Sequence, residues 1–248
     1  MAYSSLLSSL SSLFRTSEMK TIRVTLPRAW DELTPEQLAY VYSILAQGRS
    51  LEQVKSLVLF RLGRWEQDSG KALTLSDVSD LDVHLLADAL HHLDWMDEPA
   101  NPPVRLEQID GHACETDALL QTVDFGTYLL LENLWQAYLR NPAEVRPIAL
   151  MNDYLYGAPL DSPLAVYNTT AWFAALKARF EQNWPDLFKP APNVGSAEPP
   201  DMVEVMNAEL RALTGGDVTK ESAVRAVGCW RALEELNAKV KESKHYKK

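Results

Sequence analysis

The residues with the clearest capacity for metal chemistry lie at helical spacing between positions 84 and 91. His84, Asp88 and His91 fall at i, i+4 and i+7, which places their side chains on one face of a helix. Imidazole and carboxylate groups are ligands for zinc. No fourth ligand continues the spacing, and His92 lies off this face. The pattern therefore favours a polar helix face, and we expect no bound metal here.

A second pair, His112 and Cys114, places a base two residues from a thiol nucleophile. Cysteine catalysis also needs a group that orients the base and a site for the oxyanion, and the sequence marks neither. The glycine pair Gly215-Gly216 lacks the spacing of a phosphate-binding loop, so it predicts the end of a helix. We therefore predict a protein that is not an enzyme and has no catalytic residues, cofactor or metal. An enzyme with an unmarked site stays an alternative.

The charge of the chain is strongly uneven. The 248 residues include 46 % hydrophobic and 23 % charged residues, which is ordinary for a soluble globular protein, and the net charge is −10. Residues 239–248 hold five lysines and one glutamate, so this tail carries +4 and the rest −14. An acidic body repels phosphates, which disfavours nucleic-acid binding. A phage regulatory or DNA-associated helical protein that uses the basic tail is the alternative.

The cysteines and the N-terminus indicate the compartment. Cys114 and Cys229 are too few for a disulfide framework, and we interpret both as reduced thiols of a cytoplasmic protein. Residues 1–18 are rich in serine and leucine, without a basic region or a sustained apolar run. They match neither a signal peptide nor a membrane span. We interpret 1–18 as a mobile or non-native extension and expect no membrane association.

The first half of the chain predicts helices around a small β element. Residues 21–26 alternate as a strand does. Thr34-Pro35-Glu36 and Ser50 with Gln53 are helix starts. Further predictions are a β-hairpin at 64–75, a helix from Ser76 or Ser79 to about Met96 that buries Val83, Leu86, Leu90 and Leu93, and a short edge strand at 104–109 beside the hairpin.

The second half predicts helices throughout. We expect helices from Asp124, from Asn141-Pro142 with a kink at Pro147, from Ser162-Pro163, and at 201–213 and 219–242. The fold class is therefore mainly α, with a helical bundle-like body, a small β-hairpin or short-strand element and a C-terminal helical pair. The predicted divisions are the extension 1–18, the body 19–188, a proline-rich linker 189–200, and the helical pair with its basic tail 201–248.

The last predicted helix carries an apolar stripe along one face, formed by Val224, Val227, Trp230, Leu233, Leu236 and Val240. A stripe of this width must be buried, either on the body or on another chain. The sequence leaves both possibilities open. Because the stripe follows a predicted linker, we take its centre as the candidate partner-binding site, formed by Val227, Trp230, Leu233 and Leu236.

Three stretches together resemble an uncharacterised family encoded in prophage tail-gene blocks of gut bacteria. They are KTIRVTLP with WDELTP (20–27 and 30–35), LDWMDEP with PVRL (93–99 and 103–106), and RALTGGDVTKE with WRAL (211–221 and 230–233). The resemblance runs from about residue 20 to 241, and members of the family begin near Lys20. The family has no assigned catalytic residues to carry over.

The resemblance implies a part in virion morphogenesis, most directly in tail assembly. It implies either a chaperone-like assembly factor that holds another tail protein, such as a tape-measure protein, or a minor virion component. The protein is then expected in the cytoplasm of the host bacterium or in the virion. An acidic helical chain with apolar helix faces is compatible with this role, because such faces can receive partner helices.

Overall fold

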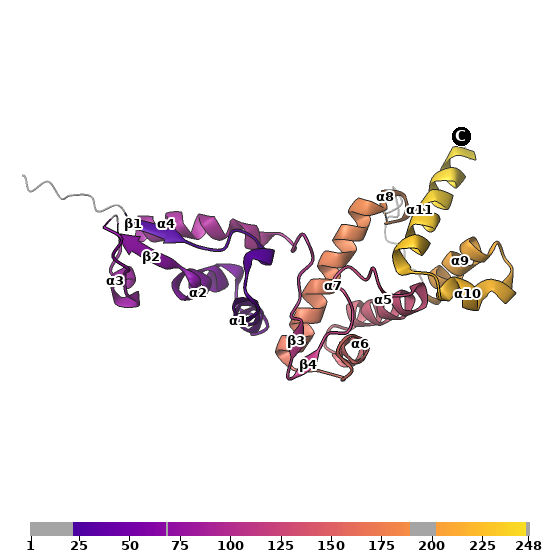
Figure 1. Ribbon diagram of the computed structural model, residues 1–248, viewed down its shortest axis with the longest axis horizontal. Helices are drawn as coiled ribbons and strands as arrows, with labels where there is room; N and C mark the ends of the chain where they lie inside the picture. The colour runs from indigo at the N-terminus through magenta and orange to yellow at the C-terminus, as the bar shows by residue number, and fades with distance from the viewer. Residues whose placement is uncertain (1–21, 68, 189–201, 247–248) are drawn as a thin grey trace, which may run out of the picture.

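The computed structural model describes residues 22–67, 69–188 and 202–246 (Figure 1). Within these residues the chain forms eleven α-helices and two small antiparallel strand pairs, which confirms the prediction of a mainly α fold with a small β element. Figure 1 shows an elongated molecule with an N-terminal lobe (residues 22–97) at the left and a C-terminal lobe (residues 104–246) at the right. The predicted extension 1–18 and linker 189–200 lie outside the described residues.

The N-terminal lobe packs short helices against one strand pair. Its elements are β1 (Ile22–Thr25), η1 (Trp30–Glu32), α1 (Pro35–Leu45), α2 (Leu51–Leu62), β2 (Arg64–Gln67), α3 (Leu75–Ser79), α4 (Val83–Leu90) and η2 (His91–Asp97). Thr34 and Ser50 each form a capping box with the glutamine three residues later, as predicted for both helix starts.

The strands pair differently from the prediction. β2 pairs with β1, whose residue Val24 lies opposite Trp65. The predicted hairpin lies on the other side of β2, as a bridge between Glu66 and Ala72 with hydrogen bonds from Gln67 N to Lys71 O and from Leu73 N to Trp65 O (both 2.9 Å). The edge strand predicted at 104–109 does not lie beside it. β3 (Gln108–Ile109) pairs instead with β4 (His112–Ala113), because the intervening Asp110 and Gly111 adopt positive φ and form a tight turn.

The single helix predicted up to Met96 is wrong, since the segment is divided into α3, α4 and η2. Thr74 and Asp82 each accept a backbone N–H with their side chains and so begin two separate helices. Val83, which was expected to be buried, is 70 % exposed, whereas Leu93 is fully buried. The capping side chains of Thr74 and Asp82 therefore divide the segment into separate helices, and hydrophobic spacing alone does not reveal such caps.

The C-terminal lobe contains the longest helices. Its elements are α5 (Phe125–Arg140), α6 (Arg146–Tyr156), α7 (Pro163–Asn183), α8 (Pro185–Phe188), α9 (Met202–Thr214), η3 (Val218–Lys220), α10 (Glu221–Arg225) and α11 (Cys229–Tyr246). The helix expected from Asn141-Pro142 begins later, at Arg146. Pro147 therefore lies in the first turn, where its missing N–H is not needed, and causes no kink.

The helix predicted at 219–242 is interrupted at residues 226–228, between α10 and α11. Here the backbone pairs with the segment that precedes α5. Phe125 N donates to Val227 O (2.8 Å), and Cys229 N donates to Val123 O (2.8 Å). Asp124 and Gly228 form the bridge between these two bonds. Backbone groups used in this pairing cannot also continue a helix.

The two lobes meet where α1 contacts α7. The Tyr42 hydroxyl donates to Val104 O (3.3 Å), and its ring lies 5.4 Å from the ring of Tyr167 on α7. Behind this contact, Asn168 is fully buried and accepts a hydrogen bond from Leu106 N (2.7 Å). Its amide also donates to the Tyr156 hydroxyl (2.9 Å), which in turn donates to Leu106 O (2.7 Å). This closed network ties the irregular segment after the N-terminal lobe to α6 and α7.

We predict that Asn168→Ala lowers the free energy of unfolding by about 2–4 kcal/mol, because it leaves the buried backbone N–H of Leu106 without its acceptor and removes one of the two hydrogen bonds of the Tyr156 hydroxyl. Urea denaturation at 25 °C measures the change. The matched control is Asn207→Ala, at an exposed position on α9, which should stay within about 0.5 kcal/mol of wild type. Equal effects of the two substitutions would contradict the structural role of Asn168.

Candidate functional site

The predicted partner-binding residues lie largely inside the chain's own core. Leu233 and Leu236 are 0 % and 2 % exposed. The Trp230 indole N–H donates to Leu119 O (2.7 Å), and its ring lies 5.1 Å from that of Trp184. Of the two possibilities that the sequence left open, the stripe packs on the body. Binding of a partner by these residues stays a prediction, and one of the four, Val227, also lines a surface groove.

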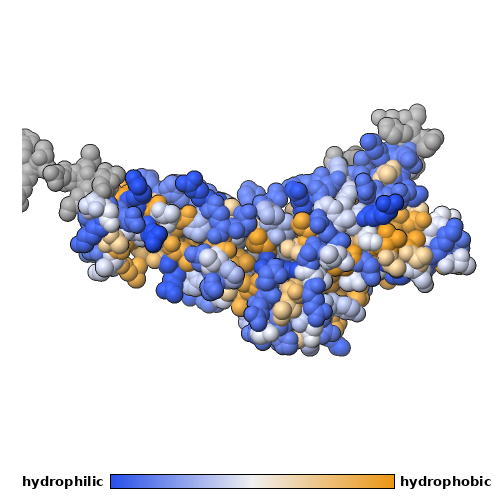
Figure 2. Space-filling model, in the orientation of Figure 1, coloured by the Kyte–Doolittle hydropathy of each residue, from blue (hydrophilic) through white to orange (hydrophobic). Residues whose placement is uncertain are grey.

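This groove, which we call the α9–α11 groove, lies between α9, α10 and α11 and has a volume of about 520 Å³. It is lined by Leu213, Val224, Val227, Arg231, Ala232, Glu234, Glu235 and Ala238. Figure 2 shows hydrophobic residues gathered over these C-terminal helices, at the right of the molecule. The volume of the α9–α11 groove falls in the range of sites that enclose a small ligand or a few side chains.

The groove follows one face of α11. Arg231, Glu234 or Glu235, and Ala238 succeed one another at intervals of three or four residues, over about 10 Å of helix. Glu235 forms an ion pair with Lys239 (3.3 Å), whereas no ion pair within the described part of the chain engages Arg231 or Glu234. The groove thus offers a short apolar floor with charged groups on its rim.

A buried ion pair lies beneath α9. Lys177 Nζ on α7 lies 2.8 Å from Glu132 Oε2 on α5, and the Glu132 residue is 6 % exposed. Glu132 also accepts hydrogen bonds from Gln136 Nε2 (2.9 Å) and the Tyr128 hydroxyl (3.3 Å). Burial, with a smaller contribution from Glu132, raises the pKa of Glu209 on α9 to about 7, against an opposing effect of Lys177.

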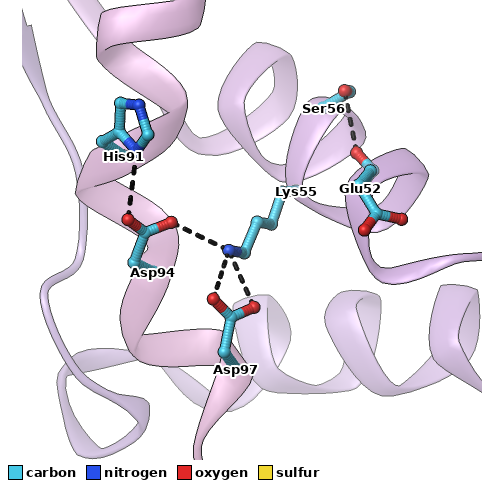
Figure 3. Close-up of polar contacts among 6 residues, drawn as sticks. All are labelled: Glu52, Lys55, Ser56, His91, Asp94 and Asp97. Carbon is cyan, nitrogen blue, oxygen red and sulfur yellow. Dashed lines mark hydrogen bonds and ion pairs between the residues drawn. The ribbon is translucent and has the colours of Figure 1, made fainter.

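A second charged cluster ties the N-terminal lobe together (Figure 3). The Lys55 ammonium on α2 lies 2.9 Å from Asp94 Oδ1 and 2.8 Å from Asp97 Oδ1, both on η2. His91 Nδ1 lies 3.1 Å from the other oxygen of Asp94. The hydrogen bond from Lys55 lowers the pKa of Asp94. Because the lysine joins α2 to η2 through two carboxylates, we interpret this cluster as structural.

The residues first considered for chemistry are not brought together. α4 ends at Leu90, so His91 begins η2 and pairs with Asp94 instead of extending the face of His84 and Asp88. Over residues 22–67, 69–188 and 202–246, no three or more His, Cys, Asp and Glu side chains are grouped closely enough for a metal ion. Cys114 lies beside Thr116 (Sγ–Oγ1 3.8 Å), while His112 is exposed.

The remaining thiol, Cys229, is buried, and two lysines of the basic tail form ion pairs within the chain. Burial raises the pKa of Cys229 to about 12, so this thiol is neutral at physiological pH. In the tail, Lys239 pairs with Glu235, and Lys244 pairs with Asp186 on α8 (3.0 Å). Two lysines of the basic tail, on which the DNA-associated alternative depends, therefore form ion pairs with carboxylates of the chain itself.

Sequence reasoning missed Glu132, Lys177 and Glu209, which lie far apart along the chain and meet only through the packing of α5, α7 and α9. Only the spacing of Tyr128, Glu132 and Gln136, four residues apart, is visible locally. Sequence spacing does not reveal which helix faces meet.

Comparison of the chain with protein-family models, curated proteins and solved structures found no match. The resemblance to the prophage tail-block family therefore stays a prediction. Across the described residues, the helices are too short or too polar to cross a membrane.

We predict that Lys177→Met lowers the free energy of unfolding by about 3–5 kcal/mol, because it leaves the buried Glu132 carboxylate unpaired. Replacing both partners, with Glu132→Leu added to Lys177→Met, should recover most of the loss. Lys241→Met, at an exposed position on α11, is the matched control. Chemical denaturation measures all three variants, and a Lys177→Met effect no larger than that of the control would disprove the importance of the pair.

Proposed function

We propose that this protein is a non-enzymatic phage tail-assembly factor, and that it binds an amphipathic helix of another tail protein in the α9–α11 groove. The observation that carries the proposal is the groove itself, an apolar depression along one face of α11, a helix whose Leu233 and Leu236 are buried in the core. The resemblance of residues 20–241 to the prophage tail-block family supplies the setting.

The shape of the groove favours a helix as its occupant. The lining residues of α11 recur at helical intervals, and a partner helix presents its own apolar residues at the same intervals. Small side chains at Ala232 and Ala238 let another backbone approach closely. A helix of two to three turns therefore matches the floor of the groove.

Charge favours a basic partner. On the rim, Glu234 and Glu235 outnumber Arg231, and the whole chain carries −10. Basic residues flanking the apolar face of the partner would lie against these glutamates and would be attracted at long range. A tape-measure protein or another tail protein with such a segment fits this description. Holding that face until assembly would prevent its aggregation, and the acidic body would keep the complex dispersed.

Affinity capture of the tagged protein from phage-producing cells tests the proposal, with mass spectrometry of both the eluate and purified virions. We expect recovery of a tail protein. Absence of the protein from virions would then indicate a chaperone, and its presence a minor virion component. Recovery of nucleic acid, or of no phage protein, would contradict the proposal.

Groove variants localise the binding. Ala238→Glu places a charge at an exposed edge of the groove, and we expect it to reduce recovery of the tail protein by about tenfold or more, the equivalent of about 1.4 kcal/mol. Ala223→Glu is the matched control, because Ala223 is exposed on α10 and does not line the groove. Equal loss in both variants, or in neither, would place the binding site elsewhere.

A further inference from the structure

The outward face of α6 exposes large apolar side chains. Leu150 is 39 % exposed and Tyr154 is 49 % exposed, whereas Ile148, Met151 and Leu155 bury the opposite face of the helix in the core. Figure 1 shows α6 at the lower edge of the C-terminal lobe and α11 at its upper edge. The outward face of α6 is therefore a surface separate from the α9–α11 groove.

Two charged residues on this face stand in an order that does not suit the helix itself. Arg146 is the first residue of α6, and Asp153 is among its last four; both are exposed. The helix dipole favours acids in the first turn and bases in the last, so α6 gains no stability from this order. Within the described residues, neither side chain forms an ion pair. Both charges are thus available to groups outside the chain.

The order of the residues on this face is complementary to itself. Its members lie at helical spacing and are placed symmetrically about Leu150: Arg146, Pro147, Leu150, Asp153 and Tyr154. When two copies of α6 pack antiparallel about a twofold axis at Leu150, each Arg146 meets Asp153 of the second copy. Leu150 then meets its own counterpart, and Tyr154 meets Pro147. Opposite charges therefore oppose each other on both sides of an apolar centre.

We propose that the outward face of α6 is an interface between two copies of this chain, related by a twofold axis that passes near Leu150. Twofold symmetry repeats every contact, so the interface contains two ion pairs between Arg146 and Asp153. One helix of 11 residues from each copy gives a small interface, so the dimer is in reversible equilibrium with the monomer. The dimer presents two α9–α11 grooves, and its formation does not rest on the proposed function.

Sedimentation velocity of the full chain, from low to high micromolar concentration, tests the proposal. We expect a reversible shift from monomer to dimer in the wild type. Arg146→Asp and Asp153→Arg should each raise the dissociation constant of the dimer by about tenfold or more, because each places like charges against each other twice. The helix dipole favours both new charges, so neither variant should lose α6. Circular dichroism checks that the helical content is unchanged.

Exchanging the two charges distinguishes a direct contact from a general effect of charge. A variant with both Arg146→Asp and Asp153→Arg restores the opposite pairs and should dimerise within about threefold of the wild type. Glu242→Arg, at an exposed position on α11, changes the net charge as Asp153→Arg does and should leave dimerisation unchanged. A wild type that is monomeric at every concentration, or single variants that dimerise as the wild type does, would overturn the proposal.

One further variant separates a second copy from another occupant. Leu150→Glu places two like charges at the twofold axis and should abolish the dimer. If the wild type is instead monomeric and Leu150→Glu prevents capture of a tail protein, this face binds that protein and the proposal fails. If the dimer forms as expected but no tail protein is captured, the proposed function fails and this inference stands.

Discussion

The C-terminal half of the molecule depends on a short backbone pairing between residues 123–125 and 227–229. Two hydrogen bonds of 2.8 Å, with the bridge between Asp124 and Gly228, end α10, begin α11 and hold the start of α5. Because Cys229 is fixed and fully buried by this pairing, the helix that follows has a defined rotation. That rotation directs Leu233 and Leu236 into the core, and Arg231, Glu234 and Ala238 toward the groove.

The same rotation explains how one helix combines a structural surface with the proposed binding surface. Trp230 packs on Trp184 and donates to Leu119 O, so it anchors α11 to the rest of the lobe. Asn237 accepts the backbone N–H groups of Asp186 and Leu187 (both 3.0 Å) and fixes the next two turns to α8. A rigidly held α11 presents a groove of defined shape, which lowers the entropic cost of binding a partner helix.

Local signals in the sequence predicted much of this fold. Thr34, Ser50 and Ser162 begin helices as expected, because a capping side chain acts within a few residues of its own position. The single helix predicted up to Met96 failed because Thr74 and Asp82 cap separate helices, and two other failures arose where distant segments pair with the same backbone groups. The interruption at 226–228 depends on residues 123–125, and the partner of β2 is a strand about forty residues earlier. Neither pairing can be recognised from the residue types and spacing within one of the paired segments.

The candidate site was only partly visible for the same reason. The sequence identified the apolar stripe and included Val227, but it could not assign Trp230, Leu233 and Leu236 to the core, because that depends on how α11 docks. The opposite face, with Arg231 and Ala238, carries no unusual residues. This face is a candidate binding surface only because it lies beside α9 and α10, with which it forms the groove.

Site-specific photo-crosslinking in phage-producing cells tests the central claim most directly. A photoreactive amino acid is placed at position 238, in the groove, or at position 223, on the exposed side of α10. The account predicts a crosslink from position 238 to a tail protein, at a segment with apolar residues in helical spacing and basic flanks. It predicts no such product from position 223. Equal crosslinking from both positions, or from neither, would contradict a helix-binding role for the groove.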